Sequence, residues 1–241
     1  MVMPSFINIA GRRRIGAFFH SLRRRPRPID KLDVRSAYRL WAPLYQAETV
    51  TSFLDEVLAQ EMLADLSYKH LLDAGCGIGR RIVNLPNATG LDLSPEMLKA
   101  GRAQNVVSGD IREMPFPNAC FDMVWCRLVL GHLSDPLAAY REFARVSVPG
   151  GHVFITDFHP DAVAAGHTRS FTDKSGRVHE IEHYVHQDHV ALAEQAGLSL
   201  AVQRDGTVGD NVRSFYADGR GLKAFQRDLG LRLVAAFLFR L

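Results

Sequence analysis

An acidic residue followed by three alternating glycines is the most informative feature of this chain. The segment 71–79 reads Leu-Leu-Asp-Ala-Gly-Cys-Gly-Ile-Gly, so Asp73 ends an apolar run two residues before the first glycine. Asp92 closes a second short apolar run, Ala-Thr-Gly-Leu-Asp, thirteen residues after the last glycine. Glycines let backbone approach a ligand closely, and an acid at the end of the next strand suits the two hydroxyls of a ribose. The pattern predicts a site for a nucleoside-like ligand.

The spacing of the glycines separates two kinds of nucleoside site. Gly75, Gly77 and Gly79 follow the form G-x-G-x-G, whereas the phosphate-binding turn of dinucleotide folds reads G-x-G-x-x-G. We therefore expect a ligand that presents no phosphate to this turn.

The elements that must position these residues alternate between strand and helix from residue 70 to the C-terminus. Apolar runs bounded by turn residues predict strands at 70–73, 88–91, 105–108, 121–126, 152–157, 198–204 and 231–240. Helices are expected at 79–86, from Ser94 with Pro95 in the first position, at 136–147 and at 187–196. Such alternation indicates a parallel α/β sheet, in which ligands lie beyond the carboxyl ends of the strands.

A helical cap is expected at 31–68, ahead of a core at 69–241. Within the cap, the stretch from about 49 to 66 carries apolar residues on one stripe and predicts a helix. The aromatic residues Tyr38, Trp41 and Tyr45 are candidates for a flap over the ligand and substrate. The alternative is that they belong to the hydrophobic core.

The first 30 residues form a basic tail. Residues 1–29 contain seven arginines and no acidic residue, which leaves a net charge of about −4 on the rest of a chain whose total is +3. The body is therefore no basic nucleic-acid surface, and we expect no nucleic-acid partner. The tail is open to four interpretations: a solvated extension, an interfacial helix that contacts an anionic membrane through residues 12–27, a targeting presequence, or a contact with an acidic partner.

The composition is that of a soluble globular protein, with 47% hydrophobic and 23% charged residues. No apolar run approaches the roughly 18 residues that a membrane-spanning helix needs. Three cysteines are too few for a disulfide scaffold. We expect a cytoplasmic protein, and the tail leaves a membrane-peripheral placement open.

Four segments in a fixed order resemble the small-molecule, methyltransferase type 11-like branch of the class I S-adenosylmethionine (SAM)-dependent methyltransferases. They are 71–79, Gly-Leu-Asp-Leu-Ser-Pro-Glu-Met-Leu at 90–98, Gly-Asp-Ile-Arg-Glu-Met-Pro-Phe-Pro at 109–117, and Phe-Asp-Met-Val-Trp-Cys at 121–126. The resemblance implies a Rossmann-like, mostly parallel seven-stranded sheet in the order 3-2-1-4-5-7-6, with helices on both faces and strand 7 alone antiparallel. It implies SAM as the cofactor and methyl transfer to an oxygen or carbon atom of a small-molecule acceptor. The connection from Gly79 to Asp92 is short, so the first helix should be curtailed.

The same resemblance assigns roles to positions of this sequence. The backbone at Gly75 and Gly77 would contact the methionine moiety, with Asp73 near its ammonium group. Asp92 would bind both ribose hydroxyls, and Asp110 the adenine amino group. The other residues expected around the cofactor are Cys76, Gly79, Leu93, Met97, Ile111, Cys126 and Arg127, the last two near the transferred methyl group.

Histidines mark the region where the acceptor should bind. A general base is needed only when the acceptor carries a proton of high pKa, and histidine suits that role near neutral pH. Seven of the ten histidines lie between His152 and His189. His159, just after the predicted strand at 152–157, is the first candidate, with a purely structural role as the alternative.

The stretch that follows supplies the remaining candidates. His183, Tyr184 and His186 come next as catalytic residues, and His167 and Arg169 could clamp the acceptor. Residues 158–186 show little periodicity and are expected to form a lid. No spacing of ligands predicts a metal site.

Two other functions stay open on the sequence alone. One is a non-catalytic SAM-binding partner or scaffold of the same fold, and the other is a different Rossmann-type enzyme, such as an NAD-dependent one. The missing G-x-G-x-x-G turn and the segment around Asp110 argue against the second. The sequence predicts neither the identity of the acceptor nor the oligomeric state.

Overall fold

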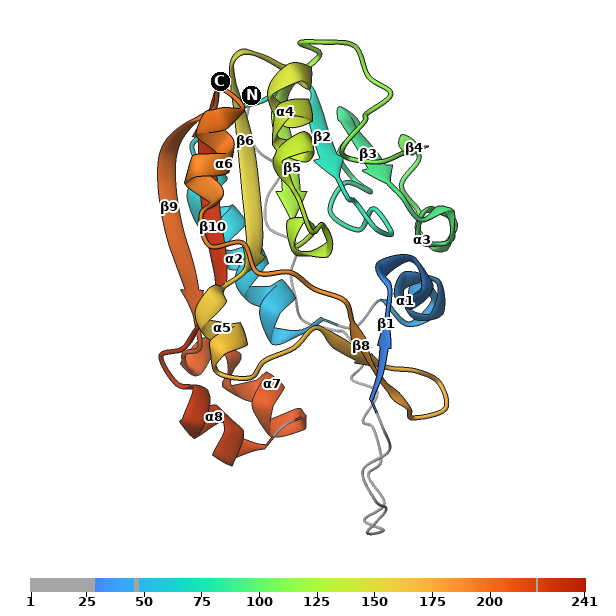
Figure 1. Cartoon of the computed structure of the whole chain (residues 1–241), viewed down its shortest axis with the longest axis vertical. Coiled ribbons are helices and arrows are strands. Elements are labelled where there is room, and N and C mark those ends of the chain that lie inside the picture. Colours follow the sequence, from blue (N-terminus) through green and yellow to red (C-terminus); the bar gives the residue numbers. More distant parts are fainter. Residues whose placement is uncertain (1–28, 46–47, 220) are drawn as a thin grey trace.

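Seven strands form one mixed sheet that carries the main core (Figure 1). The computed structural model describes residues 29–45, 48–219 and 221–241. The strands are β2 (Leu71–Ala74), β3 (Ala88–Asp92), β4 (Val106–Ser108), β5 (Phe121–Arg127), β6 (Ser147–Phe158), β9 (Ser199–Thr207) and β10 (Arg232–Arg240). Their order is β4-β3-β2-β5-β6-β10-β9, and β10 runs antiparallel to both neighbours. Numbered along the core, this is 3-2-1-4-5-7-6, so the predicted fold is confirmed.

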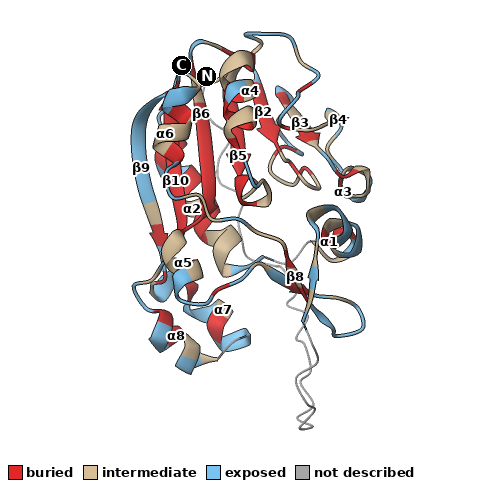
Figure 2. Cartoon of the chain, in the orientation of Figure 1, coloured by how far each residue is buried: buried red, intermediate tan, exposed pale blue. Residues whose placement is uncertain are grey.

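Helices cover both faces of this sheet. α4 (Leu137–Val146) and α6 (His189–Gln195) lie on one face, and α2 (Val50–Leu63) lies on the other (Figure 1). Side chains alternate between the faces along each strand. On β2, Leu71 packs in the core on the α2 side and Leu72 in the core on the α4 side. β5 is buried almost throughout, as its apolar run predicts for a central strand (Figure 2).

The predicted cap at 31–68 divides into two structurally different parts. α1 (Val34–Trp41) and the short helix η1 (Ala42–Leu44) lie beyond the carboxyl ends of the strands. α2 instead lies against the sheet, where Leu54 and Leu58 would both contact a side chain placed at Gly206 of β9. Thr49 begins α2 with a capping box, because its hydroxyl accepts from the Ser52 N–H and the Ser52 hydroxyl accepts from the Thr49 N–H.

Shorter elements gather at the carboxyl end of the sheet, and the periodicity of the sequence predicted almost none of them. β1 (Asp30–Leu32), β8 (Val178–Ile181) and β7 (Ser170–Thr172) form a small three-stranded sheet beside α1 (Figure 1). The others are α3 (Pro95–Ala100), η2 (Leu130–His132), α5 (Pro160–Ala164), η3 (Asp210–Val212), α7 (Arg213–Asp218) and α8 (Leu222–Asp228). α3 begins as predicted, with Ser94 as its N-cap. Residues 158–186 thus contain one helix and two strands.

The helix expected at 79–86 is absent. Successive turns replace it, in which the N–H groups of Ile82, Leu85 and Ala88 each bond the carbonyl three residues earlier. The chain has thirteen residues between β2 and β3, and the first five are occupied by the glycine turn. A crossover between parallel strands usually needs a dozen or more residues, so too few remain for a regular helix.

Two expectations concern a membrane. Residues 12–27, expected to meet a membrane or an acidic partner, lie outside the described residues, which begin at Ile29. Within the described ranges, no helix is long and apolar enough to cross a membrane.

Candidate active site

A cavity of about 270 Å³ lies between the carboxyl ends of β2, β3 and β5 and the helix α1. We call it the first cavity. Open α/β sheets bind their ligands at this edge. Of the residues predicted around the ligand, nine line it: Gly75, Cys76, Gly77, Asp92, Leu93, Met97, Asp110, Ile111 and Arg127.

Asp92 is held rigidly at the end of β3. One carboxylate oxygen accepts from the Gly77 N–H at 2.7 Å, and the other accepts from the Ser94 N–H at 2.8 Å. Each oxygen keeps a lone pair for a further donor. Burial raises the pKa of Asp92, although these two backbone donors oppose the shift. The carboxylate is therefore tied to the glycine turn and still able to accept from a ligand hydroxyl.

The glycine turn requires its glycines for two separate reasons. Gly75, Gly77 and Gly79 all have positive φ, which other residues rarely adopt. A Cβ at Gly75 would also lie 2.5 Å from a methyl carbon of Val129, and one at Gly79 would lie 2.6 Å from Cβ of Ala103. The turn can therefore approach a ligand only as bare backbone.

Three of the residues predicted around the cofactor do not line the first cavity. Gly79 is buried against Ala103, behind the turn. Cys126 is completely buried among side chains on the α4 side of the sheet, because alternation along β5 turns Arg127, and not its neighbour, toward the cavity. The expectation that Cys126 lies near the transferred group is therefore wrong. Asp73 is fully buried, and among the described residues neither carboxylate oxygen has a hydrogen-bond partner. Burial raises its pKa.

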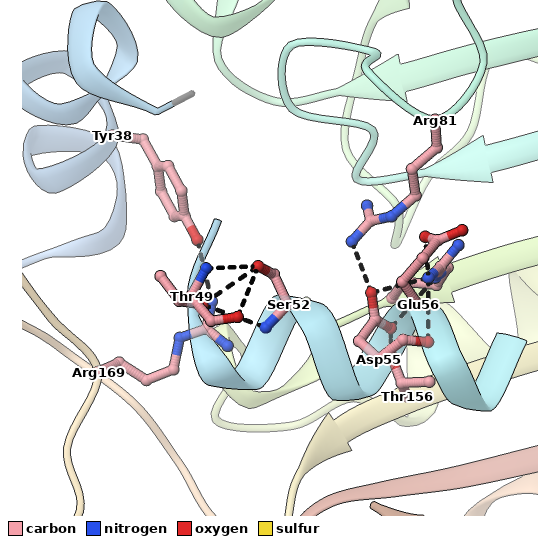
Figure 3. A network of polar contacts seen from close by, with 9 residues as sticks. Tyr38, Thr49, Ser52, Asp55, Glu56, Arg81, Thr156 and Arg169 are labelled. Carbon is pink, nitrogen blue, oxygen red and sulfur yellow. Dashed lines mark hydrogen bonds and ion pairs between the residues drawn. The ribbon is translucent and has the colours of Figure 1, made fainter. Parts of the chain in front are cut away.

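A buried ionic network lies below the glycine turn (Figure 3). Asp55 of α2, fully buried, accepts from Arg127 at 2.9 and 3.1 Å, from Arg81 at 3.0 Å and from the Thr156 hydroxyl at 2.6 Å. Burial by itself would raise the pKa of Asp55, but the two guanidinium groups lower it to about 2. Arg81 and Arg127 line the first cavity, and Arg81 was not among the residues predicted from the sequence. The pair Arg80-Arg81 directly after the turn was the available signal.

A second cavity of about 330 Å³ adjoins the first and shares Tyr45 and Leu128 with it. It lies beside α7 and is lined by three of the predicted substrate residues besides Tyr45: Trp41, His167 and Arg169. Its lining includes the arginines Arg80 and Arg169 but one carboxylate, Glu48. The nitrogen Nη1 of Arg169 is buried without a hydrogen-bond partner in the described part of the chain.

Tyr38 lies between the two cavities. It lines the first, stacks on Trp41 with ring centroids 5.7 Å apart, and accepts from Nη2 of Arg169 at 3.4 Å. Its hydroxyl also lies 2.9 Å from Nε2 of His132. His132 follows β5 in η2, and the sequence analysis did not single it out as a functional residue. Burial lowers its pKa to about 3, so the ring is neutral at physiological pH.

None of the three histidines predicted to be catalytic lines either cavity. His159 begins α5 as its N-cap, where Nδ1 accepts from the Asp161 N–H at 3.0 Å, and it lines neither cavity. His183 has its ring against Gly131 and lies 3.8 Å from Asp157. His186 contacts the Leu130 carbonyl at 3.1 Å, so both residues attach the segment after β8 to η2. Tyr184 lines the first cavity, and its hydroxyl donates to Glu182.

The sheet order, the glycine turn and the acids at the ends of β3 and β4 define a class I SAM-dependent methyltransferase. The chain belongs to this family. A family model described as a methyltransferase domain matches residues 72–155. The malonyl-[acyl-carrier protein] O-methyltransferase of Dechloromonas aromatica is 30% identical over 202 residues, which cover 81% of this chain and 76% of the relative.

Other proteins with the same description are also similar. The malonyl-[acyl-carrier protein] O-methyltransferase of Herminiimonas arsenicoxydans is 34% identical over 164 residues, or 64% of this chain and 56% of the relative. The chain thus matches little more than half the length of that protein. Among solved structures, a SAM-dependent methyltransferase from Mesorhizobium loti has the same fold, with a TM-score of 0.57 and 19% identity over 78% of this chain and all of the other.

The residues of the first cavity fit SAM. The turn presents bare backbone at Gly75 and Gly77 to the cavity, where an added Cβ would meet Val129 or Met97. Asp92 can still accept from hydroxyls, and the orphaned carboxylate of Asp73 and the cationic Arg81 lie near the same turn. A ligand with a ribose and an amino-acid moiety matches this set of groups.

Proposed function

We propose that this chain transfers a methyl group from SAM to a carboxylate oxygen of its acceptor. The observation that carries the proposal is the buried Nη1 of Arg169, which has no partner among the described residues and belongs to a side chain that lines the second cavity. A buried guanidinium with a free donor is costly unless an acceptor completes its hydrogen bonds, and an anion forms the strongest such bond. A carboxylate of the acceptor would do so.

The cofactor would occupy the first cavity along its whole length. Asp92 would accept from the ribose hydroxyls, Asp110 and the Ile111 backbone would contact adenine, and Leu93 and Met97 would flank the ring. The turn at Gly75, Cys76 and Gly77 would meet the amino-acid moiety, with Asp73 near its ammonium group. When bound, SAM supplies an electrophilic methyl group.

A carboxylate acceptor requires no general base. Acids of ordinary pKa are ionised at neutral pH, so their oxygen is already a nucleophile. The task left to the protein is to align the oxygen and to exclude water. The junction of the two cavities would be covered by Tyr38, Trp41 and Tyr45. Arg169 would hold the acceptor in the second cavity, which His167 also lines. In this function His183, Tyr184 and His186 position the covering segment and do not remove a proton.

Two relatives suggest a narrower class of acceptor. Both are described as methyltransferases of malonyl-[acyl-carrier protein], which carries a carboxylic acid. We place the acceptor of this chain in the same chemical class, a short carboxylic acid with an extended attachment. Arg80, at the wall of the second cavity, would add a second positive charge for it.

Incubation with labelled SAM tests the proposal. The acceptors are malonyl-loaded carrier protein, malonyl-coenzyme A and a catechol, and mass spectrometry identifies the product. We expect a methyl ester on a malonyl group. Methylation of the phenol alone would rule out the carboxylate acceptor. Binding of SAM with no product, in these mixtures and in a metabolite extract, would indicate the non-catalytic SAM-binding function.

The basic tail has a separate role in our proposal. We assign residues 12–27 a peripheral contact between a cytoplasmic protein and an anionic membrane surface, supported by their charge and by the spacing of Ile15, Phe18, Phe19 and Leu22 in the sequence. Co-sedimentation of the full chain with phosphatidylserine vesicles tests this role, and the control has its six clustered arginines changed to glutamine. Equal binding of both proteins would contradict it, and retention by an acidic protein alone would favour the acidic partner.

A further inference from the structure

The absence of a helix after the glycine turn means that no helix N-terminus supplies positive charge there, among the residues that the structure describes. A helix that follows such a turn presents its N-terminus, with partial positive charge and free N–H groups, to an anionic part of a ligand. Residues 80–86 form turns in this chain and supply no helix N-terminus. The amino-acid moiety of SAM carries a carboxylate, which needs a positive partner from another source.

Arg81 lies in the place of that missing helix and points inward (Figure 3). Its side chain is 12% exposed, lines the first cavity and donates from Nη2 to Asp55 at 3.0 Å. Its Nε is buried, and no described residue accepts a hydrogen bond from it. A buried donor on a charged group that has no partner costs free energy until something accepts from it.

The neighbouring arginines are not equivalent candidates. Two nitrogens of Arg127 are engaged by the protein, because Nε and Nη2 bond the Asp55 carboxylate and Nη2 also bonds the Asp55 carbonyl and Glu56. Arg80 lines the second cavity and not the first. Arg81 therefore combines access to the first cavity, burial and an unused donor.

The contacts around Asp55 prepare Arg81 for an anion. One fully buried carboxylate is shared by hydrogen bonds between two guanidinium groups, while the further acid that touches Arg127, Glu56, is 44% exposed at its side chain. Asp73 is also fully buried and offsets part of the positive charge, but it forms no hydrogen bond with a described residue, so the Nε donor of Arg81 stays unused. Asp55 also fixes the orientation of Arg81, which reduces the entropy lost when an anion binds.

We infer that Arg81, held by Asp55, binds the carboxylate of the methionine moiety of SAM in place of a helix N-terminus. The inference concerns the cofactor and does not depend on the identity of the acceptor. It predicts that Arg81 discriminates between nucleosides with and without an amino-acid moiety.

Calorimetry with two ligands tests this inference. S-adenosylhomocysteine contains the amino-acid moiety, and 5′-methylthioadenosine lacks it. We expect Arg81→Met to weaken S-adenosylhomocysteine binding by about tenfold to a hundredfold, the value of a charged hydrogen bond, and to change methylthioadenosine binding less than about twofold. Arg81→Lys should recover part of the loss, because it keeps the charge but not the planar fork.

Arg102→Met is the matched control, since it removes an exposed arginine that lines neither cavity and should leave the affinities of both ligands unchanged. An equal loss for the two ligands in Arg81→Met would show that Arg81 only maintains the shape of the site. Unchanged S-adenosylhomocysteine binding would also overturn the inference. If Arg81→Met does not fold, the affinities of Arg81→Lys for the two ligands are compared instead. A loss of affinity confined to S-adenosylhomocysteine supports the inference, and no loss or an equal loss for both ligands contradicts it.

Discussion

The hydroxyl of Tyr38 lies 2.9 Å from Nε2 of His132, and this contact joins the covering helix α1 to the end of the central strand. Nδ1 of His132 lies 3.4 Å from the carbonyl oxygen of Glu182, which can only accept. The ring proton therefore belongs on Nδ1, and Nε2 accepts from the tyrosine. Because Arg169 donates to the same hydroxyl, the hydrogen bonds run in one direction from Arg169 to Glu182. Four segments around the two cavities are coupled by this chain.

Tyr38→Phe should impair acceptor binding more than cofactor binding. The substitution removes the donor to His132 and the acceptor for Arg169, so Arg169 loses its orientation in the second cavity. We expect kcat/KM for the acceptor to fall about tenfold, the value of one hydrogen bond left unmade in a buried place. Steady-state kinetics and calorimetry with S-adenosylhomocysteine measure the two effects. Tyr68→Phe, at the opposite end of the sheet beside Trp125, is the control, and equal losses in both variants would contradict the role of Tyr38.

His132 should make the folded protein sensitive to acid. Its pKa is about 3 in the folded state, mainly through burial, against an ordinary value of 6.5, so between these values the unfolded state binds more protons. Stability therefore rises with pH across this window and is lost as the pH falls below about 6.5. The free energy of unfolding should fall in both proteins when the pH is lowered from 7 to 5. We expect the fall in the native chain to exceed that in His132→Gln by about 1–2 kcal/mol.

Urea unfolding at the two pH values measures that difference. His70→Gln, at an exposed position before β2, is the control for the loss of a histidine outside the core. If the drop is the same in His132→Gln and the native chain, the histidine is not held neutral by the fold.

Much of the fold could be predicted because each core element has a local signal. The apolar run of β5, the Ser94-Pro95 start of α3 and the order of the glycine turn and Asp92 all depend on nearby residues. The absent helix after Gly79 follows from chain length, which the short connection already indicated. The small sheet of β1, β7 and β8 could not be predicted, because its strands have three or four residues and β1 pairs with a segment almost 150 residues away.

Site residues could be predicted where the local backbone fixes their position. They could not be predicted where contacts between distant segments fix it. Gly75 and Asp92 are placed by the turn itself. Cys126 was misassigned because a strand sends neighbouring side chains to opposite faces, and its neighbour Arg127 points to the cavity. Arg81 acquires its role from Asp55, which lies 26 residues earlier on α2. No pattern within either segment indicates that pairing.

Asp55→Asn should strongly destabilise the fold. The variant leaves two buried guanidinium groups without their shared counter-ion, and removing one partner of a buried pair costs about 3–5 kcal/mol. Glu56→Gln is a matched control on the same helix, because Glu56 also contacts Arg127 but is 44% exposed, where a pair contributes at most about 1 kcal/mol. Urea unfolding compares the two. Similar losses in both variants would mean that burial of Asp55 does not decide its contribution.

Asp92→Ala and Gly75→Val should each abolish measurable SAM binding. The first removes the acceptor for the Gly77 and Ser94 N–H groups together with the expected ribose contact. The second places a branched side chain at φ +80°, where a Cβ already lies 2.5 Å from Val129. We expect the affinity for SAM to fall at least about a hundredfold in calorimetry. Asp65→Ala, at an exposed position after α2, controls for the loss of a surface acid, and retained affinity in both site variants would contradict the cofactor site described above.

Arg169→Met should separate acceptor recognition from cofactor binding. The guanidinium has one buried nitrogen free for an anion, while its other contact is with Tyr38 and not with the cofactor turn. A charged hydrogen bond to a carboxylate contributes about 1.5–3 kcal/mol, so kcat/KM for a malonyl acceptor should fall roughly tenfold to a hundredfold. The affinity for S-adenosylhomocysteine should stay within about twofold of the native value. Arg177→Met, in the exposed loop between β7 and β8, removes a nearby positive charge without touching either cavity. If both arginine variants lower kcat/KM equally, general charge attracts the acceptor; if neither does, the acceptor is not bound as a carboxylate by Arg169.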